Sequence, residues 1–333
     1  MAKTIDEVSG ADVTGDDVKS FQIIEDTDLV GIGKVHIDDV IEYVHTGMQK
    51  KLPTPMDLYA RYLKQRWNVF ELDFTQDAID WHDKMTEEER QAFIDISSGF
   101  HHGERQVEVD LVPFMMSGSE DEKIYISSQI EDEARHTVFF DRFYKEVVKL
   151  PGESIMDVLD ASYQYITETF VGPFGLLAYL ADDLRLNPDD PHRRVRYSAL
   201  YHLWIEGVLA LVVMKVTLGF GRDRGFLPAY YTGFTATCRD EARHVQFGMR
   251  FLYDHIKQDP SYANDVLQVL QTLFNMSGAV SRIANTEPLG FDVPMLREMM
   301  VTQLHKKLGV IGVQLPEKMQ AQLMSMEPVI AGG

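Results

Sequence analysis

A five-residue motif that occurs twice constrains the fold of this chain more than any other feature. The sequence Asp-Glu-Ala-Arg-His stands at 132–136 and returns unchanged at 240–244, in a chain of 333 residues. On a helix, residues three apart project from one face about one turn apart. Each copy therefore predicts a helix whose Glu and His side chains can reach the same point in space.

Each copy of the motif also follows a stretch of helical periodicity that carries a single glutamate among apolar or small residues. Glu104 precedes Glu133 by 29 residues, and Glu206 precedes Glu241 by 35 residues. These spacings suit two antiparallel helices joined by a short turn. Folded together, the two halves predict a four-helix bundle with one Glu on each of two helices and Glu-x-x-His on each of the other two.

The predicted convergence of four carboxylates in a core indicates a site for metal ions. Such carboxylates repel one another and lose their hydration when buried, and two divalent cations would neutralise them. Oxygen and imidazole donors without thiolate favour two metal ions, Mn and Fe or two Fe, over an iron–sulfur cluster or structural zinc. The six predicted ligands are Glu104, Glu133, His136, Glu206, Glu241 and His244. The residues expected to orient these ligands are Asp132, Arg135, Asp240 and Arg243.

A single Glu-x-x-His is a weak signal, because on most helices it forms a solvated pair. A third match, Glu42 to His45, lacks the flanking Asp and Arg and has no matching half, so it is left out of the predicted site. Three further histidines lie near the predicted ligands in sequence, and surface or core packing is the expected role of His101, His102 and His202.

The remaining pattern predicts an all-α protein. Capping boxes formed by Thr86 with Glu89 and by Ser119 with Glu122 mark helix starts, and strand signals are almost absent. The predicted helices lie near 57–68, 87–115, 120–149, 154–183, 191–219, 228–257, 261–285 and 293–308. At most one short strand is expected before them, around Leu29 to Ile37. We predict a ferritin-like four-helix bundle with additional helices and a dinuclear metal site in its core. The predicted divisions are a partly irregular extension at 1–55, the helical domain at 56–310 and a tail at 311–333.

Composition argues against several classes of partner and location. The formal net charge of −20 and the pI near 4.9 disfavour nucleic acid and anionic membranes as partners. Cys238 is the single cysteine and cannot form an internal disulfide, and the charged first thirty residues do not match a secretory signal, so we predict a cytoplasmic protein. The most apolar stretch, Gly207 to Phe220, is shorter than the roughly 20 residues of a membrane span. It contains Lys215 and is interpreted as a buried helix.

The order Glu, Glu-x-x-His, Glu, Glu-x-x-His resembles that of the ribonucleotide reductase small-subunit superfamily, and within it most closely that of the ligand-binding oxidases. The resemblance covers roughly residues 60–285 and implies a homodimer in which Glu133 and Glu241 help to bridge the metals. One turn beyond the first motif, where a reductase subunit has its radical tyrosine, this chain has Phe140, and no tyrosine follows Tyr262. Storage of a tyrosyl radical, and its transfer through a C-terminal tail, are therefore not expected.

The same resemblance implies an organic ligand beside the metals. Ala210 stands one turn after Glu206, where reductase subunits tend to have a bulkier side chain, so an apolar pocket can open there, and Phe140 and Ala210 are expected in its wall. The ligand-binding oxidases hold a long-chain fatty acid in this place, and they form an ether cross-link between residues that correspond to Val107 and Tyr201. On an ideal helix Tyr201 would lie roughly 140° from Glu206. A local bulge in this helix would bring them together.

The predicted function is a two-electron oxidation by dioxygen at the metal pair. Three alternatives remain open from the sequence. One is a radical-generating ribonucleotide reductase subunit in which a manganese–iron pair replaces the tyrosyl radical. Another is an acyl-carrier-protein desaturase-like enzyme, although its docking needs a basic patch that a chain of charge −20 supplies poorly. The third is a ferritin-like storage or binding protein, for which the chain is long.

Overall fold

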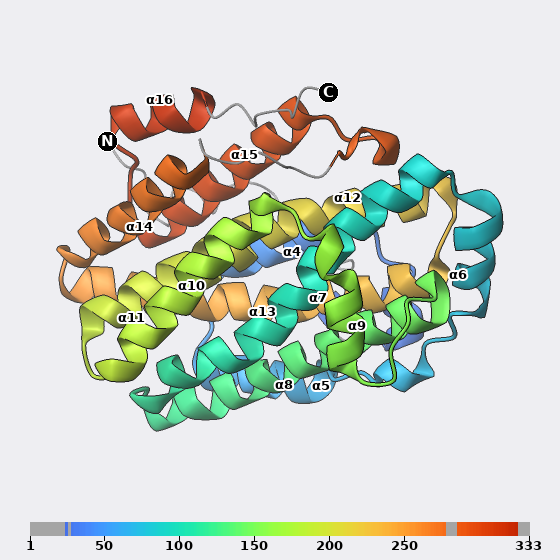
Figure 1. Cartoon of the computed structure of the whole chain (residues 1–333). Helices are drawn as coiled ribbons and strands as arrows, with labels where there is room; N and C mark the ends of the chain where they lie inside the picture. The colour runs from blue at the N-terminus through green and yellow to red at the C-terminus, as the bar shows by residue number, and fades with distance from the viewer. Residues whose placement is uncertain (1–23, 26–27, 278–284, 326–333) are drawn as a thin grey trace.

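Every regular element in the part of the chain that the structure describes is a helix (Figure 1). The structure, a computed structural model, describes residues 24–25, 28–277 and 285–325. Four long helical segments form the central bundle. Their bounds are Glu87–Met116 for α7, Glu120–Phe143 for α8, Pro191–Ser198, Ala199–Ala210 and Leu211–Arg224 for the continuous segment α11, η5 and α12, and Pro228–Gln258 for α13. The predicted all-α bundle is confirmed.

The starts of α7 and α8 are fixed by the two predicted capping boxes. In α7 the backbone N–H of Thr86 donates to the Glu89 carboxylate at 2.8 Å, and the Thr86 hydroxyl accepts from the backbone N–H of Glu89. Ser119 and Glu122 make the same reciprocal pair at the start of α8. Each box satisfies backbone donors that a helix start leaves without partners.

The start of α13 is capped by a residue far away in sequence, Asp77 of the short helix α6 (Thr75–Ile79). Its two carboxylate oxygens accept the backbone N–H groups of Ala229 and Tyr230 at 2.9 and 2.7 Å. Burial raises the pKa of Asp77 to about 6, although both hydrogen bonds favour the charged form. This contact fixes where the helix that carries the second motif begins.

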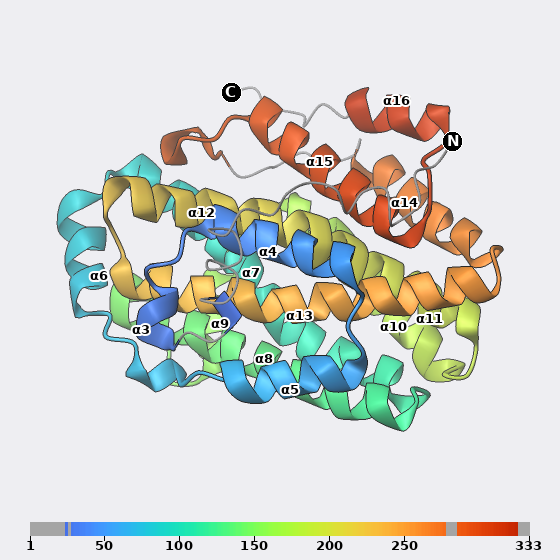
Figure 2. The same cartoon turned by 180° about the vertical axis from the view of Figure 1, so that it is seen from behind.

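Shorter helices cover the bundle (Figures 1 and 2). Helix α4 packs along α13 and α5 packs on α8, while α14, α15 and α16 gather on the opposite side of the bundle from α5. The bounds of the covering helices are Leu29–Ile32 (α3), Ile37–Lys50 (α4), Pro55–Gln65 (α5), Val69–Glu71 (η1), Asp80–Lys84 (η2), Tyr144–Val148 (η3), Ile155–Ser162 (α9), Tyr163–Tyr165 (η4), Glu168–Leu186 (α10), Tyr262–Ser277 (α14), Glu287–Leu289 (η6), Val293–Ile311 (α15) and Glu317–Ser325 (α16).

The strand expected around Leu29 to Ile37 is wrong, because this region forms α3 and the start of α4. The β-branched run that suggested a strand is interrupted by side-chain caps. Asp28 accepts the backbone N–H of Gly31 at 2.7 Å, and His36 accepts that of Asp38 at 3.1 Å. From residue 37 onward the buried positions fall on one helical face, which packs on α13.

Other predicted boundaries also differ from the structure. The helix predicted at 154–183 is two helices, α9 and α10, separated by the 3-10 turn η4. The segment predicted as a tail contains α16, and the end of the helix predicted at 261–285 lies outside the described residues. The domain limits at 55 and 310 stay predictions.

The continuous segment Pro191–Arg224 is long and apolar enough to cross a membrane by composition alone, but 83% of its most apolar window is buried inside the protein. It is the core helix that the sequence predicted. Lys307 of α15 covers it on one side, with a fully buried side chain whose Cε lies 3.4 Å from where a Cβ on Gly207 would stand. The Nζ of Lys307 donates to Gln303 at 2.5 Å, and burial lowers the pKa of this amine to about 7.

Candidate metal centre

The first group of donors lies around His136 of α8. Its Nδ1 faces three carboxylate oxygens, at 3.6 Å from Glu104 of α7, 3.5 Å from Glu133 of α8 and 3.5 Å from Glu241 of α13. All four side chains are buried. Three helices of the bundle thus bring four of the predicted ligands to one point.

The second group lies around His244 of α13. Its Nδ1 is 3.2 Å from Glu133, 3.3 Å from Glu206 of η5 and 3.1 Å from Glu241. Glu133 and Glu241 therefore belong to both groups, and each offers one oxygen to each histidine. The donor atoms of each group all lie within 4.8 Å of one another.

The donor set fits two metal ions. Among the described residues, Nδ1 of His136 has no hydrogen-bond partner although three carboxylates face it, and neither has Oε2 of Glu206. A buried nitrogen or oxygen lone pair without a partner is costly, and a bound cation would satisfy it. Carboxylate oxygens with one imidazole per group suit first-row divalent metals such as iron and manganese.

Burial and the neighbouring charges shift the pKa values of the carboxyl groups in the site. Burial raises the pKa of Glu206 to about 8 and that of Glu104 well above its usual range. Burial acts in the same direction on Glu133, but His244 and His136, whose own pKa values the surrounding carboxylates raise, outweigh it when protonated and hold the pKa of Glu133 at about 2. The site without cations thus keeps protons on some carboxyls, and cations that bind there must displace them.

The two copies of the motif are joined by hydrogen bonds on the side of the histidines that faces away from the shared carboxylates. Nε2 of His136 lies 3.3 Å from Asp240 of the other copy, and Nε2 of His244 lies 3.2 Å from Asp132 of the other copy. Arg243 donates to both aspartates, at 2.7 Å to Asp132 and 2.9 Å to Asp240. Arg135 also contacts both and donates to Asp240 at 3.0 Å. Both guanidiniums lower the pKa of Asp240 against the effect of its burial.

Sequence reasoning missed two side chains that touch this network. Nε1 of Trp67 donates to Asp240 at 2.8 Å. Nε2 of Gln129 donates to the Tyr201 hydroxyl at 3.1 Å and to Glu206 at 3.2 Å. Gln129 stands four residues before Glu133 on the same face of α8, a spacing that could have identified it. Trp67 comes from the segment after α5, and no local pattern connects it to the motif.

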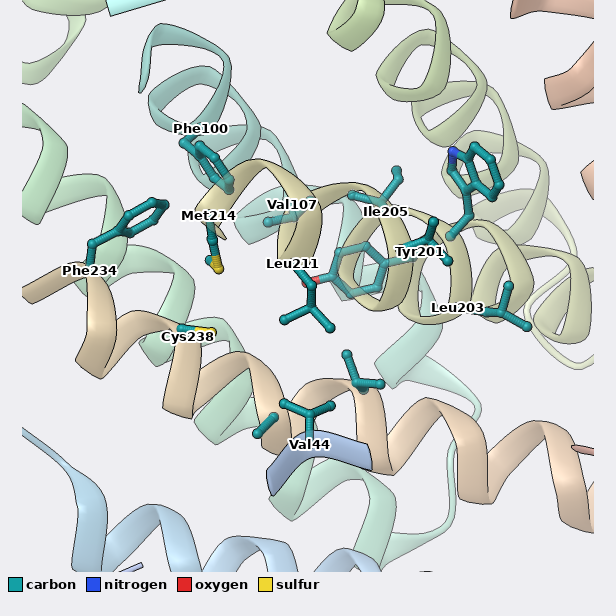
Figure 3. Close-up of a cluster of buried hydrophobic side chains, with 14 of the residues drawn as sticks. Val44, Phe100, Val107, Tyr201, Leu203, Ile205, Leu211, Met214, Phe234 and Cys238 are labelled. Atoms are coloured by element: carbon teal, nitrogen blue, oxygen red, sulfur yellow. The ribbon is translucent and has the colours of Figure 1, made fainter. Parts of the chain in front are cut away.

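Tyr201 reaches the same site because its helix is not an α-helix there. Residues Ala199–Ala210 form a π-helix, so the bulge predicted in this helix is present. The wider turn lets Tyr201 and Glu206 face one region, and the Tyr201 hydroxyl donates to Glu133 at 2.7 Å. Figure 3 shows the phenol of Tyr201 pointing into a cluster of buried side chains that includes Val107 and Leu211.

A mostly apolar pocket opens beside the carboxylates. It contains about 400 Å³ of space between atoms, open solvent at its mouth included. Its apolar wall includes Phe100, Val107, Phe170, Phe174, Ile205, Leu209 and Ala210. Phe140, which we expected in this wall, does not line the pocket. It is fully buried, and its ring stacks on the ring of Phe100 at 5.9 Å.

Comparisons with known proteins agree with this arrangement. A protein-family model described as "Ribonucleotide reductase, small chain" matches residues 48–173 of this chain. An R2-like ligand-binding oxidase from Sulfolobus acidocaldarius is similar in structure, with 22% identity over 82% of this chain and 96% of that one, and a TM-score of 0.68. Two point mutants of an R2-like ligand-binding oxidase, one tyrosine-to-phenylalanine and one glycine-to-leucine, each with an anaerobically reconstituted Mn/Fe cofactor, give TM-scores of 0.66 at 21% and 22% identity. Each of these two matches covers 77% of this chain and 92% of the other.

The resemblance that the order of the predicted ligands indicated is therefore confirmed, and the chain has the ferritin-like fold of the ribonucleotide reductase small chain and of these oxidases.

Proposed function

We propose that this chain is an oxidase that uses dioxygen at a pair of metal ions, Mn and Fe or two Fe. The observation that carries this proposal is the double donor group, in which two histidine nitrogens each face three carboxylates and share Glu133 and Glu241. Similar folds with a Mn/Fe cofactor support the choice of metals. When bound, the metals would supply the electrons and open coordination positions that the reduction of dioxygen needs.

The residues of the chain have distinct roles in this proposal. Glu104 and His136 would hold one metal, and Glu206 and His244 would hold the other, while Glu133 and Glu241 could serve both. The aspartates of the opposite copies accept a hydrogen bond from the Nε2–H of each histidine, which leaves the lone pair of each Nδ1 for a metal. Because Arg135 and Arg243 neutralise these aspartates, the outer network adds no charge to the site.

The apolar pocket would hold a long-chain fatty acid or a similar apolar ligand. Val107, Leu209 and Ala210 line it directly beside Glu104 and Glu206. An apolar wall keeps water from the carboxylates, which strengthens every electrostatic interaction in the site. The occupant of the pocket can be identified by mass spectrometry of the organic extract of the purified protein.

We also propose that reaction with dioxygen joins Val107 to Tyr201 through an ether bond. Both residues line the pocket, and Glu133 accepts the phenol hydrogen bond and so stands ready to take the phenol proton. The new bond joins the phenol oxygen to a carbon of the valine. Two protons and two electrons leave the pair, and dioxygen is the electron acceptor.

The decisive experiment is peptide mass spectrometry after anaerobic loading with Fe(II) and Mn(II) followed by exposure to oxygen. The expected product is a joined pair of peptides that contain Val107 and Tyr201 and lack two hydrogens. Separate peptides in a fully metallated sample would contradict the cross-link and shift the assignment toward the reductase and desaturase alternatives.

Metal content tests the ligands separately from the chemistry. Elemental analysis should find two metals per chain in the native protein and a loss of metal in Glu133→Gln, because this residue serves both donor groups. Glu42→Gln is the matched control, since Glu42 also belongs to a Glu-x-x-His sequence but lies outside the donor groups. Full metal content in Glu133→Gln would overturn the assignment.

A second candidate is a radical-generating subunit of a ribonucleotide reductase. The observation that favours it is a chain of hydrogen bonds from Trp67 through Asp240 to His136, with distances of 2.8 and 3.3 Å. An indole in this place could carry single electrons between the surface and the metals. Pull-down with a reductase large subunit discriminates, because only this second function needs that complex.

We propose a homodimer, as the resemblance implies. Three apolar side chains on one face of α7, Val109, Val112 and Met116, are exposed at helical spacing and would suit contact with a second copy. Analytical ultracentrifugation should find twice the mass of one chain. The cytoplasmic location stays a prediction.

A further inference from the structure

Two phenylalanines of α10 rest directly on two glycines of α7. A Cβ at Gly99 would lie 2.4 Å from the ring of Phe170, and a Cβ at Gly103 would lie 2.7 Å from the ring of Phe174. Both pairs follow a spacing of four residues, so the two rings fit the two gaps on one face of α7. Contacts this close are possible only because neither glycine has a side chain.

The same two rings form the contribution of α10 to the wall of the apolar pocket. They stack on each other with centroids 6.1 Å apart, and Phe170 also packs edge-on against Phe100 at 6.1 Å. Phe170 is buried, whereas Phe174 is half-buried. Phe174 therefore stands between the pocket and solvent, at the seam of α7 and α10.

Helix α10 is weakest between the two rings. Pro173 lies inside the helix and follows Gly172, so one backbone hydrogen bond is missing at this turn and the helix bends there most easily. Gly175 lies two residues further on, and no atom lies within 4 Å of where its Cβ would stand. On the α7 side the seam is held by Gln106, whose side-chain amide donates to the carbonyl of Phe174 at 2.8 Å.

We propose that Phe170 and Phe174 form a gate that determines how long an acyl chain the pocket accepts. This inference rests on the proposed function, because it assumes an apolar ligand beside the carboxylates. A short chain fits between the carboxylates and the rings. A longer chain can continue only along the seam between α7 and α10, and it must push the rings off Gly99 and Gly103.

Selection by length follows from this geometry. Each added methylene normally strengthens binding as it leaves water. For a chain long enough to pass the two rings, this gain in binding free energy is opposed by the loss of the contacts that the rings make with α7 and with each other. Removal of the Phe174 ring should therefore strengthen the binding of a long chain and leave that of a short chain nearly unchanged.

The test compares octanoic acid with hexadecanoic acid, bound by equilibrium dialysis to the metal-loaded full-length protein. In Phe174→Ala the affinity for hexadecanoic acid relative to octanoic acid should rise about tenfold over the native ratio, which is the worth of about two buried methylenes. Tyr179→Ala is the matched control, because Tyr179 is an aromatic residue of the same helix that is 66% exposed and does not line the pocket. Phe174→Leu serves if the alanine variant does not fold.

The outcomes separate the gate from the proposed function. A ratio that rises in Phe174→Ala or Phe174→Leu but not in Tyr179→Ala supports the gate. Binding of both acids with the same ratio in all variants overturns the gate and leaves the proposed function standing. If neither acid binds to any variant, the gate and the proposed apolar ligand both fail, while the metal and cross-link measurements still decide the oxidase.

Discussion

The buried amine of Lys307 predicts a strong pH dependence of stability that one substitution should remove. The pKa of this group falls from 10.5 to about 7 because the side chain is buried under α15 against the core helix. One unit of pKa shift corresponds to about 1.4 kcal/mol. Since the unfolded chain carries the charged amine, burial of Lys307 costs about 4 kcal/mol of unfolding free energy near neutral pH.

The direction in which stability changes with pH follows from the lowered pKa of Lys307. The folded state binds this proton less tightly than the unfolded state, so the contribution of the neutral amine is complete above about pH 10.5 and is lost as the pH falls through about 7. In Lys307→Met the penalty disappears, and the hydrogen bond to Gln303 is lost at a cost of about 1 kcal/mol. The variant should be more stable by about 3 kcal/mol at neutral pH.

Urea denaturation at neutral pH and at about two pH units higher measures both effects. The native protein should gain stability from this group over the interval, and Lys307→Met should lack that gain. The control is Lys215→Met, whose partly exposed side chain forms an ion pair with Asp38 at 2.7 Å. It should change stability by less than about 1 kcal/mol. A Lys307→Met protein that is less stable than the native one, or that keeps the native pH slope, would refute the reasoning.

Three further outcomes are expected. Tyr201→Phe should keep two metals by elemental analysis but give no cross-linked peptide, because it lacks only the phenol oxygen. Asp132→Asn should weaken Mn(II) binding roughly tenfold to 100-fold in an equilibrium titration, since it weakens the support of His244; unchanged affinity would argue against this role. Burial raises the pKa of Asp77 to about 6, so its contribution to stability is present at acidic pH and lost as the pH rises through about 6. Urea denaturation below and above this pH should show that Asp77→Asn loses less unfolding free energy than the native protein as the pH rises.

The sequence was informative where a local pattern has one physical meaning. The capping box at Thr86 needs only residues within one turn, and the Glu-x-x-His spacing needs only a helix, so both were predicted. The π-helix at Ala199–Ala210 was predicted only with the help of the family resemblance, which placed Tyr201 beside Glu206 although the two do not share a face on an α-helix. The capping box and the Glu-x-x-His spacing depend on geometry within one helix.

The features that were missed depend on contacts between distant segments. Trp67 meets Asp240 across 173 positions of sequence, and Asp77 caps a helix that begins about 150 residues later. The strand expected near Leu29 failed for a local reason, since Asp28 and His36 supply helix caps that outweigh the β-branched run. The absence of Phe140 from the pocket wall depends on how Phe100 packs, which no periodicity reveals.

The contacts between the two motif copies have a consequence for the newly synthesised chain. Each histidine contacts an aspartate of the other copy, and each donor group takes carboxylates from both halves of the sequence. The first half, once it leaves the ribosome, cannot yet assemble either donor group. Translation must pass His244 before a complete set of donors exists. Acquisition of metal therefore reports that both halves have been made and have docked, and a truncated product would stay empty.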